Sequence, residues 1–140
     1  CTLTTDIMVG FAGESDEDFE TSLRFMEEIG FEKVHVFPYS IRKGTRAEKL
    51  DGQLEKKIKE DRCKIMIEKA EEIRRDFFSK QVGKTFSIII ESKTDCGYAT
   101  GYTANYIPVK IKLPSDMSGS MVNVKIVGVS NEDYLIGEII

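Results

Sequence analysis

The chain has 140 residues, a formal net charge of -4 and 41% hydrophobic residues. This length suits one ordinary domain or two small ones, and the hydrophobic content excludes a disordered chain. The negative charge excludes a general polyanion binder, so any contact with nucleic acid must depend on local geometry.

Targeting and redox signals are sparse. No apolar run approaches the roughly 20 residues that span a bilayer, and no basic-then-apolar leader opens the chain, so we expect no membrane association. The three cysteines, Cys1, Cys63 and Cys96, match neither a CxxC nor a CxxxCxxC metal pattern. An odd number of cysteines argues against a disulfide framework and favours a cytoplasmic location. Because the first residue is Cys1 and not methionine, we expect a piece of a longer protein.

The first part of the chain predicts a strand–helix–strand unit. Residues 4–10 form an apolar run, and a glycine-rich turn follows it. Ser15 and Asp18 have the spacing of a capping box, and Gly30 stands where the helix should stop. Residues 33–39 predict the second strand. This order implies a parallel pair joined by a right-handed crossover.

A long helix and a β-rich segment complete the predicted fold. The helix extends from about Leu54 to Phe78, with an apolar stripe at Leu54, Ile58, Ile65, Met66, Ala70, Ile73 and Phe77. Residues 79–140 hold short alternating runs at Thr85–Glu91, Tyr98–Thr103, Tyr106–Lys112, Met121–Val127 and Tyr134–Ile140. We therefore predict an α+β protein with domains at 1–78 and 79–140, the second a five-stranded antiparallel barrel of the oligonucleotide-binding kind.

The strand-to-turn segment at 6–15 is the first candidate site. Backbone N–H groups at a helix start favour anions, and glycines allow close approach of a ligand. The segment is neither a P-loop nor a GxGxxG turn, so a tight turn without a ligand is equally consistent with it. Asp6 lies inside an apolar strand, where a carboxylate needs a partner, so it is either a site residue or a buried structural residue.

The loop after residues 33–39 is the second candidate. Ligands bind at the carboxyl ends of parallel strands. Tyr39 could stack on a base, Ser40 could hydrogen-bond, and Arg42 could hold a carboxylate or phosphate. The alternative is an ordinary loop with exposed charges. His35 is the only histidine, which excludes a histidine-rich metal site, and we interpret it as a packing or hydrogen-bonding residue.

The β-rich end supplies a third candidate. Tyr102 and Tyr106 flank a short connection near Lys110 and Lys112, whose alternation with aliphatic residues predicts an outward orientation. Tyrosines beside lysines suit stacking on unpaired bases with phosphate contacts nearby. The alternative is that both tyrosines cap the barrel core.

The amino-acid sequences of these segments resemble one family. TTDIMVGFAGESDEDFETSLRF is similar to the fifth strand and helix of the radical-SAM methylthiotransferase barrel, with Ala12 where the family usually has proline. HVFPYSIRKGTRA resembles the sixth strand and its loop, in the form of the branch that acts on threonylcarbamoyladenosine. GYTANYIPVKI, GSMVNVKIVGV and LIGEI resemble the TRAM domain that ends these enzymes. The resemblance extends over essentially the whole chain.

The resemblance implies a fold and an activity. Residues 1–78 would be a βαβα remnant of a radical-SAM, partly TIM-like barrel, and residues 79–140 a TRAM domain that binds RNA. The parent enzyme would use S-adenosylmethionine and two [4Fe-4S] clusters to add a methylthio group to C2 of a modified adenosine beside the tRNA anticodon. The CxxxCxxC that holds the radical-SAM cluster is not in this sequence, so we expect neither metal ligands nor catalytic residues here.

The resemblance also assigns binding roles. Residues near S-adenosylmethionine or the target base would be Asp6, Val9, Gly10, Phe37, Tyr39, Ser40 and Arg42. Residues gripping the tRNA anticodon arm would be Tyr102, Asn105, Tyr106, Lys110 and Lys112.

Two alternatives and one consequence remain open. The chain could be a non-catalytic RNA-binding module, or it could belong to a methylthiotransferase that acts on a ribosomal protein. A severed barrel also exposes a strand edge, through which we expect the fragment to self-associate.

Overall fold

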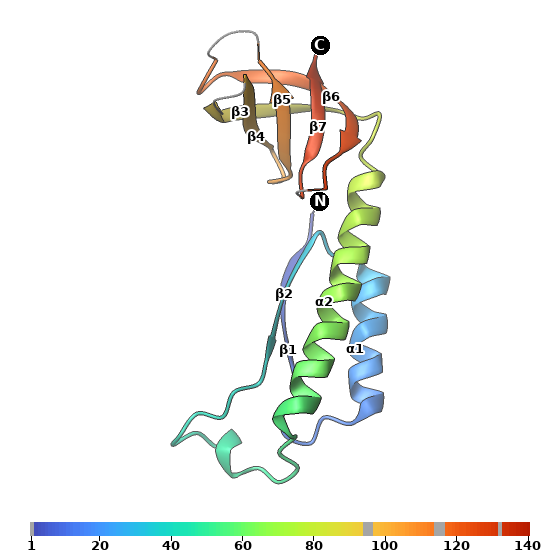
Figure 1. Cartoon of the computed structure of the whole chain (residues 1–140), viewed down its shortest axis with the longest axis vertical. Coiled ribbons are helices and arrows are strands. Elements are labelled where there is room, and N and C mark those ends of the chain that lie inside the picture. Colours follow the sequence, from blue (N-terminus) through green and yellow to red (C-terminus); the bar gives the residue numbers. More distant parts are fainter. Residues whose placement is uncertain (1, 94–96, 114–116, 132) are drawn as a thin grey trace. The chain divides into compact units, whose positions relative to one another are not determined.

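A computed structural model describes residues 2–93, 97–113, 117–131 and 133–140, and confirms a mixed α+β fold (Figure 1). Cys1 and Cys96 lie outside the described residues. The chain divides into two compact units: Leu3–Arg75 forms the first, and Asp76–Ile140 together with Thr2 forms the second. The assignment of functions to domains 1–78 and 79–140 stays a prediction.

The first unit contains a two-stranded parallel sheet. Its elements are β1 (Thr4–Val9), α1 (Asp16–Ile29), β2 (Lys33–Pro38), the short 3-10 helix η1 (Ala47–Lys49) and most of α2 (Lys56–Ser79). β1 pairs in parallel with β2, in a register that runs from Thr4 opposite Lys33 to Val9 opposite Pro38. The strand–helix–strand order therefore gave a correct prediction of the parallel pair.

Both ends of α1 follow from its sequence. The Ser15 hydroxyl accepts a hydrogen bond from the Asp18 N–H at 3.1 Å, and the Ser15 N–H donates to the Asp18 carboxylate at 3.0 Å. Gly30 ends the helix with a φ of 68°, in the left-handed region that glycine occupies without steric cost. The predicted capping box and helix stop are confirmed.

The capping box makes the stability of α1 depend on pH. Hydrogen bonds from the Ser15 hydroxyl, and then from the Ser15 N–H, lower the pKa of Asp18 from its ordinary value of 3.8. A lowered pKa stabilises the fold fully above 3.8, and that contribution is lost as the pH falls through the lower folded value. Asp18→Asn should therefore lower the urea midpoint of the helical signal at pH 7.

The measurement is urea unfolding at pH 7 and at about pH 2, followed by circular dichroism. The difference from wild type should vanish at about pH 2, where the carboxyl is protonated in both states. Glu17→Gln is the matched control, because it removes a first-turn charge without touching the capping box. An equal loss in both variants, or a loss that persists in acid, would refute the proposed contribution of Asp18.

The helices cover one face of the sheet (Figure 1). The shared core of this unit consists of Val9, Phe19, Met26, Phe31, Met66 and Ile73. The predicted α2 stripe is correct at Met66 and Ile73 but wrong at Ile58 and Ile65, which are exposed. At the N-terminal end of α2 a different face of the helix is buried, and Lys59 and Arg62 lie on it in place of Ile58 and Ile65. The cause is a set of polar partners on the turn and loop facing α2.

The second unit is a closed barrel, with strands β3 (Thr85–Lys93), β4 (Tyr98–Thr103), β5 (Pro108–Lys112), β6 (Met121–Val129) and β7 (Leu135–Ile139). Around the barrel the order is β3-β4-β5-β7-β6. The predicted five-stranded barrel is confirmed, but it is mixed and not antiparallel throughout, because β5 pairs with β7 in parallel. A closed ring with an odd number of strands cannot alternate direction throughout, so at least one neighbouring pair must be parallel.

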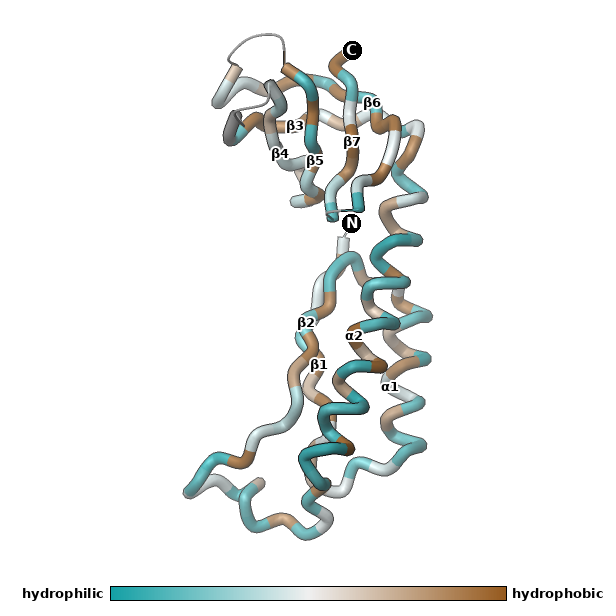
Figure 2. The backbone as a smooth tube through the Cα atoms, viewed as in Figure 1, coloured by the Kyte–Doolittle hydropathy of each residue, from teal (hydrophilic) through white to brown (hydrophobic). Residues whose placement is uncertain are grey.

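The barrel core consists of the inward residues of these strands. Val109, Ile111, Val124 and Ile126 are buried, whereas Lys125 between two of them is exposed, as the alternation predicted. The same alternation of hydrophobic and hydrophilic residues can be followed along the strands in Figure 2. Phe78 of α2 belongs to this core. No helix within the described ranges combines the length and apolar composition that crossing a membrane would require.

Candidate functional site

The candidate site lies where β1 and β2 end side by side. The N–H of Tyr39 donates to the carbonyl of Val9 at 2.8 Å, so the strand pairing continues one residue beyond β2. Both strands therefore deliver their following loops to the same edge of the sheet. This is the location at which parallel sheets bind ligands.

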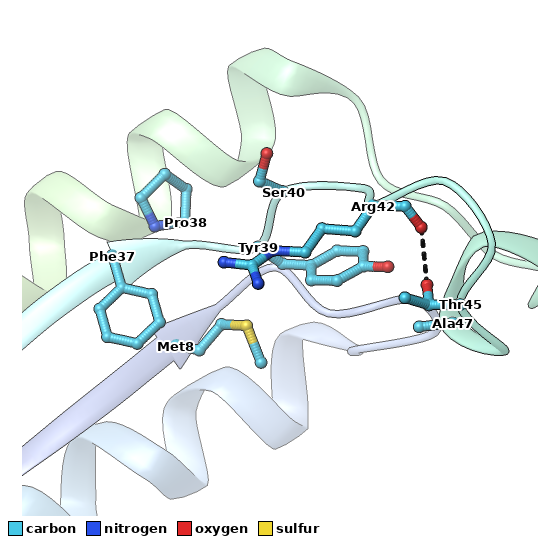
Figure 3. A pocket seen from close by; sticks show the side chains of 8 residues that line it. All are labelled: Met8, Phe37, Pro38, Tyr39, Ser40, Arg42, Thr45 and Ala47. Carbon is cyan, nitrogen blue, oxygen red and sulfur yellow. Dashed lines mark hydrogen bonds between the residues drawn. The ribbon is translucent and has the colours of Figure 1, made fainter.

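A pocket of about 260 Å³ opens at this edge (Figure 3). Met8 and Phe37 are opposite each other in the strand register and form part of its wall, each close to half exposed. The Arg42 side chain reaches back toward these two residues. The remaining lining residues are Pro38, Tyr39, Ser40, Thr45 and Ala47. An apolar wall beside a guanidinium suits a ligand that has both a flat apolar part and an anionic group.

The structure brings together Phe37, Tyr39, Ser40 and Arg42, the members of the predicted set that come from β2 and its loop. Asp6 is exposed on the same sheet face as Met8 and lies opposite His35, so it is not a buried structural carboxylate.

The other β1 candidates face elsewhere. Val9 is fully buried in the core and does not line this pocket. Gly10 is also buried, with a φ of 74°, and a Cβ there would lie 2.5 Å from Cγ of Lys59. Glycine is therefore required at this position both by the backbone conformation and by the packing of a lysine against it.

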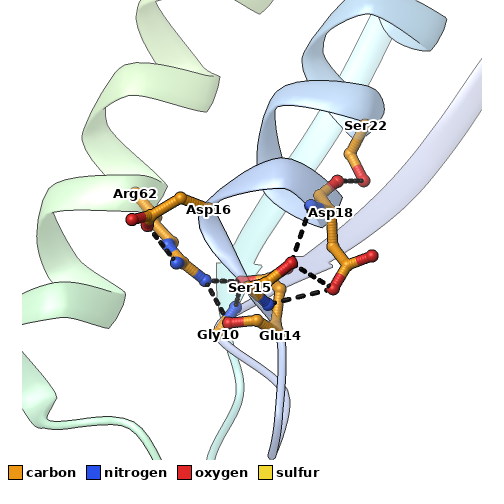
Figure 4. A network of polar contacts seen from close by, with 7 residues as sticks. All are labelled: Gly10, Glu14, Ser15, Asp16, Asp18, Ser22 and Arg62. Carbon is orange, nitrogen blue, oxygen red and sulfur yellow. Dashed lines mark hydrogen bonds and ion pairs between the residues drawn. The ribbon is translucent and has the colours of Figure 1, made fainter.

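The glycine turn is held by a polar network (Figure 4). The Gly10 N–H donates to the Glu14 carboxylate at 2.7 Å, so the first amide of the turn already has an anionic partner. Arg62 of α2 pairs with the same carboxylate, donates to the Glu14 carbonyl at 3.0 Å and pairs with Asp16 at 2.6 Å. Burial alone would lower the pKa of Arg62, but its hydrogen bonds to Asp16 and Glu14 raise it above the ordinary value. This network positions the turn relative to α2.

Sequence reasoning missed Arg62 and Lys59. Both side chains are less than a tenth exposed. The Lys59 ammonium lies 4.9 Å from the centroid of the Tyr39 ring, a cation–π distance. The available signal was their spacing, since Lys59, Arg62 and Met66 share one helical face.

The residues predicted to bind RNA lie on the barrel. Tyr106 is 83% exposed, so its interpretation as a core cap is wrong, and Tyr102 is also exposed. Tyr106 has a φ of 62°, which is uncommon for a non-glycine residue and often marks a functional position. Thr103 fixes the turn, because its hydroxyl bonds to the Asn105 side chain at 2.7 Å and accepts from the Ile107 N–H at 3.0 Å. Asn105 therefore supports the turn that presents Tyr106.

The lysines of β5 lie beside aromatic residues of the barrel. Lys112 is opposite Tyr98 in the register and is exposed. The Lys110 ammonium is 5.5 Å from the Tyr98 ring centroid and 4.8 Å from that of Tyr134, and it donates to the Tyr134 hydroxyl at 2.8 Å. Lys110 thus orders two aromatic side chains, and Lys112 is the lysine of this pair that faces solvent. The exposed face formed by Tyr98, Tyr102, Tyr106 and Lys112 is referred to below as the aromatic face.

Comparison with known proteins identifies a class. No protein-family model matches the chain. The curated relatives are tRNA methylthiotransferases, at 32–37% identity over most of this chain. This similarity confirms the resemblance of the chain to the methylthiotransferase family.

The names of these relatives indicate two different modified adenosines. The threonylcarbamoyladenosine tRNA methylthiotransferase MtaB of Chlamydia pneumoniae is 37% identical over 98% of this chain and 32% of its own length. The tRNA-2-methylthio-N(6)-dimethylallyladenosine synthase of Aliarcobacter butzleri is 37% identical over 99% of this chain and 32% of its own length. MtaB of Bacillus subtilis is 34% identical over 89% of this chain and 28% of its own length. The chain spans about a third, or less, of the curated relatives it matches.

Proposed function

We propose that this chain is part of an enzyme that adds a methylthio group to a modified adenosine in tRNA. The observation that carries the proposal is similarity to tRNA methylthiotransferases over nearly the whole chain, including both the sheet edge and the barrel. As the substrate we favour threonylcarbamoyladenosine beside the anticodon, because residues 35–42 carry the sequence motif HVFPYS-x-R. A protein substrate has no comparable support among these relatives.

The first unit would supply one wall of the S-adenosylmethionine site, as the end of a radical-SAM barrel. The pocket fits this group in its chemistry: Met8 and Phe37 offer an apolar surface for an adenosyl ring, and Arg42 offers a cation for the carboxylate. S-adenosylmethionine, with iron–sulfur clusters, would supply the radical and methyl-transfer chemistry. No group of His, Cys, Asp and Glu side chains in the described part of the chain could hold a metal ion, so we assign no cluster ligand to it.

The aromatic face would bind the anticodon arm, which is the role expected of a TRAM domain. Tyr102 and Tyr106 are exposed and can stack on unpaired bases, while Lys112, opposite Tyr98 at the other end of the β4–β5 pair, can contact phosphate. Base stacking on an aromatic side chain contributes about 1–3 kcal/mol. Tyr106→Ala should therefore weaken binding of an anticodon-arm RNA hairpin about tenfold, and Tyr102→Ala should also weaken it.

Fluorescence anisotropy with a labelled hairpin measures this effect at fixed salt concentration. Phe25→Ala is the control, because it removes an exposed aromatic residue of the other unit. Equal affinity of wild type and the double tyrosine variant would remove the aromatic face from the proposal.

The activity itself can be tested in a chimera. Residues of this chain would replace the matching segment of the Bacillus subtilis MtaB enzyme in cells that lack it. We expect mass spectrometry of digested tRNA to detect methylthio-threonylcarbamoyladenosine. A stable chimera whose tRNA gains no methylthio group would favour the non-catalytic RNA-binding alternative. Transfer of the methylthio group to dimethylallyladenosine instead would show that the proposed substrate is wrong.

A further inference from the structure

A second pocket lies between the loop after β2 and the first turn of α2, within the first unit. Its volume is about 550 Å³, and Tyr39, Ser40, Lys56 and Lys59 contribute its polar lining. Pro38, Ile41 and Leu54 add apolar walls. None of the roles proposed above uses Lys56 or Lys59, so the purpose of this basic lining needs a separate explanation.

The charge at this end of α2 is opposite to what a helix start prefers. The helix begins with Lys56 and Lys57, followed by Ile58 and Lys59, and its first turn has no acidic residue. A helix N-terminus carries partial positive charge, which acidic side chains stabilise and lysines do not. α1 follows the ordinary pattern, with three acidic residues in its first turn. Glu55 precedes these lysines and Glu60 pairs with Lys56, so Lys59 is the lysine of this turn that a bound anion in the pocket would pair with.

Two polar groups at the pocket, one of them a buried hydroxyl, have no hydrogen-bond or ion-pair partner within the described residues. The Tyr39 hydroxyl is buried without a hydrogen bond, and Tyr39 as a whole is only 9% exposed. Lys59 is 8% exposed, and no hydrogen bond or ion pair to its ammonium is found in the described ranges. Buried polar groups are nearly always satisfied in native proteins, by protein, solvent or ligand. The Tyr39 hydroxyl thus indicates that the pocket receives an acceptor, and the Lys59 ammonium supplies a cation beside it.

The acid nearest to the pocket does not supply this acceptor. Glu60 lines the pocket, but its carboxylate pairs with Lys56 at 3.4 Å, and both of these side chains are largely exposed. The Lys59 ammonium instead lies over the Tyr39 ring. The cation–π contact orients the ammonium without giving it a hydrogen-bond acceptor.

We propose that this pocket binds a phosphate group. The Lys59 ammonium would pair with it, the Tyr39 hydroxyl would donate to it, and the free amides at the start of α2 would add further donors. A phosphate has enough acceptor oxygens for all three kinds of donor, and its charge matches the lysine-rich turn. The inference depends on the geometry of the first unit and not on the methylthiotransferase activity.

The test is calorimetric titration of the full chain with inorganic phosphate, against sodium chloride at equal ionic strength. Wild type should show saturable binding of one phosphate. Lys59→Met, which keeps the stem packed on Gly10, should weaken it at least about tenfold, and Tyr39→Phe should weaken it several-fold. Lys64→Met is the matched control, since it removes an exposed lysine of α2 that does not line this pocket. Helical circular dichroism confirms that each variant is folded.

A second titration identifies the source of the phosphate. A short single-stranded RNA would be titrated into wild type and Lys59→Met, with and without inorganic phosphate. Competition by phosphate, together with weaker RNA binding by Lys59→Met, would identify an RNA phosphodiester. Phosphate binding that depends on Lys59, with RNA affinity unchanged, would identify a small phosphorylated ligand. No saturable phosphate binding, or binding unaffected by both pocket variants, would overturn the proposal.

Discussion

Gly101→Ala should unfold the β-barrel or destabilise it by at least about 3 kcal/mol. Gly101 is buried in β4 and pairs with Ile90 of β3 and Val109 of β5. A Cβ at this position would lie 2.4 Å from the carbonyl oxygen of Ile89. The obstacle is backbone held in a closed ring, so it cannot move aside as the end of a flexible side chain would.

Gly128→Ala is the matched control for this prediction. It lies in β6 of the same barrel, and the nearest atoms to its added Cβ are side-chain atoms of Ile136 at 3.8 Å and beyond, an ordinary contact. Near-ultraviolet circular dichroism follows the barrel, because every tyrosine except Tyr39 belongs to it. Gly101→Ala should lose the folded signal at much lower urea than Gly128→Ala. Similar midpoints for the two variants would mean that the strands can separate to accept a methyl group.

The barrel shows which features a sequence pattern can predict. Alternation of aliphatic and charged residues in β5 and β6 is a local property, and it gave the strands and their inward faces correctly. The direction of β7 is not local. β7 enters between β5 and β6, and its parallel pairing with β5 follows from closing a five-membered ring. The requirement for glycine at Gly101 likewise depends on how closely β3 approaches.

The candidate site likewise contains some residues that sequence reasoning predicted and others that it missed. Tyr39, Ser40 and Arg42 were predictable because residues after a parallel strand gather at one edge of a sheet. Lys59 and Arg62 were missed, although they share a helical face with Met66, because a helical pattern assigns charged residues to solvent. Their burial depends on a carboxylate and an aromatic ring supplied by segments distant in sequence, Glu14 and Tyr39. The functional roles of the predicted residues stay proposals until binding is measured.

Arg62→Met should destabilise the first unit by about 3 kcal/mol, since it breaks a largely buried ion pair from one side. The Arg62 side chain is 8% exposed and that of Glu14 is 13% exposed, whereas Asp16 is almost fully exposed. Most of the loss should therefore come from the Glu14 contacts. Without Arg62 the Glu14 carboxylate keeps, among the described residues, only the Gly10 N–H as a hydrogen-bond partner. The turn that packs against Lys59 would lose its main connection to α2.

A double-mutant cycle separates this pairing from simple loss of packing. If the pair dominates, Arg62→Met combined with Glu14→Gln should cost clearly less than the sum of the two single changes. Arg75→Met is the control on the same helix, because its pair with Glu71 is two-thirds exposed and such pairs contribute at most about 1 kcal/mol. Urea unfolding at 222 nm reports chiefly on α1 and α2. Strict additivity would show that Arg62 acts through contacts other than the Glu14 pair, such as its guanidinium over the Phe19 ring at 5.4 Å. In that case the network in Figure 4 would not be what fixes the glycine turn.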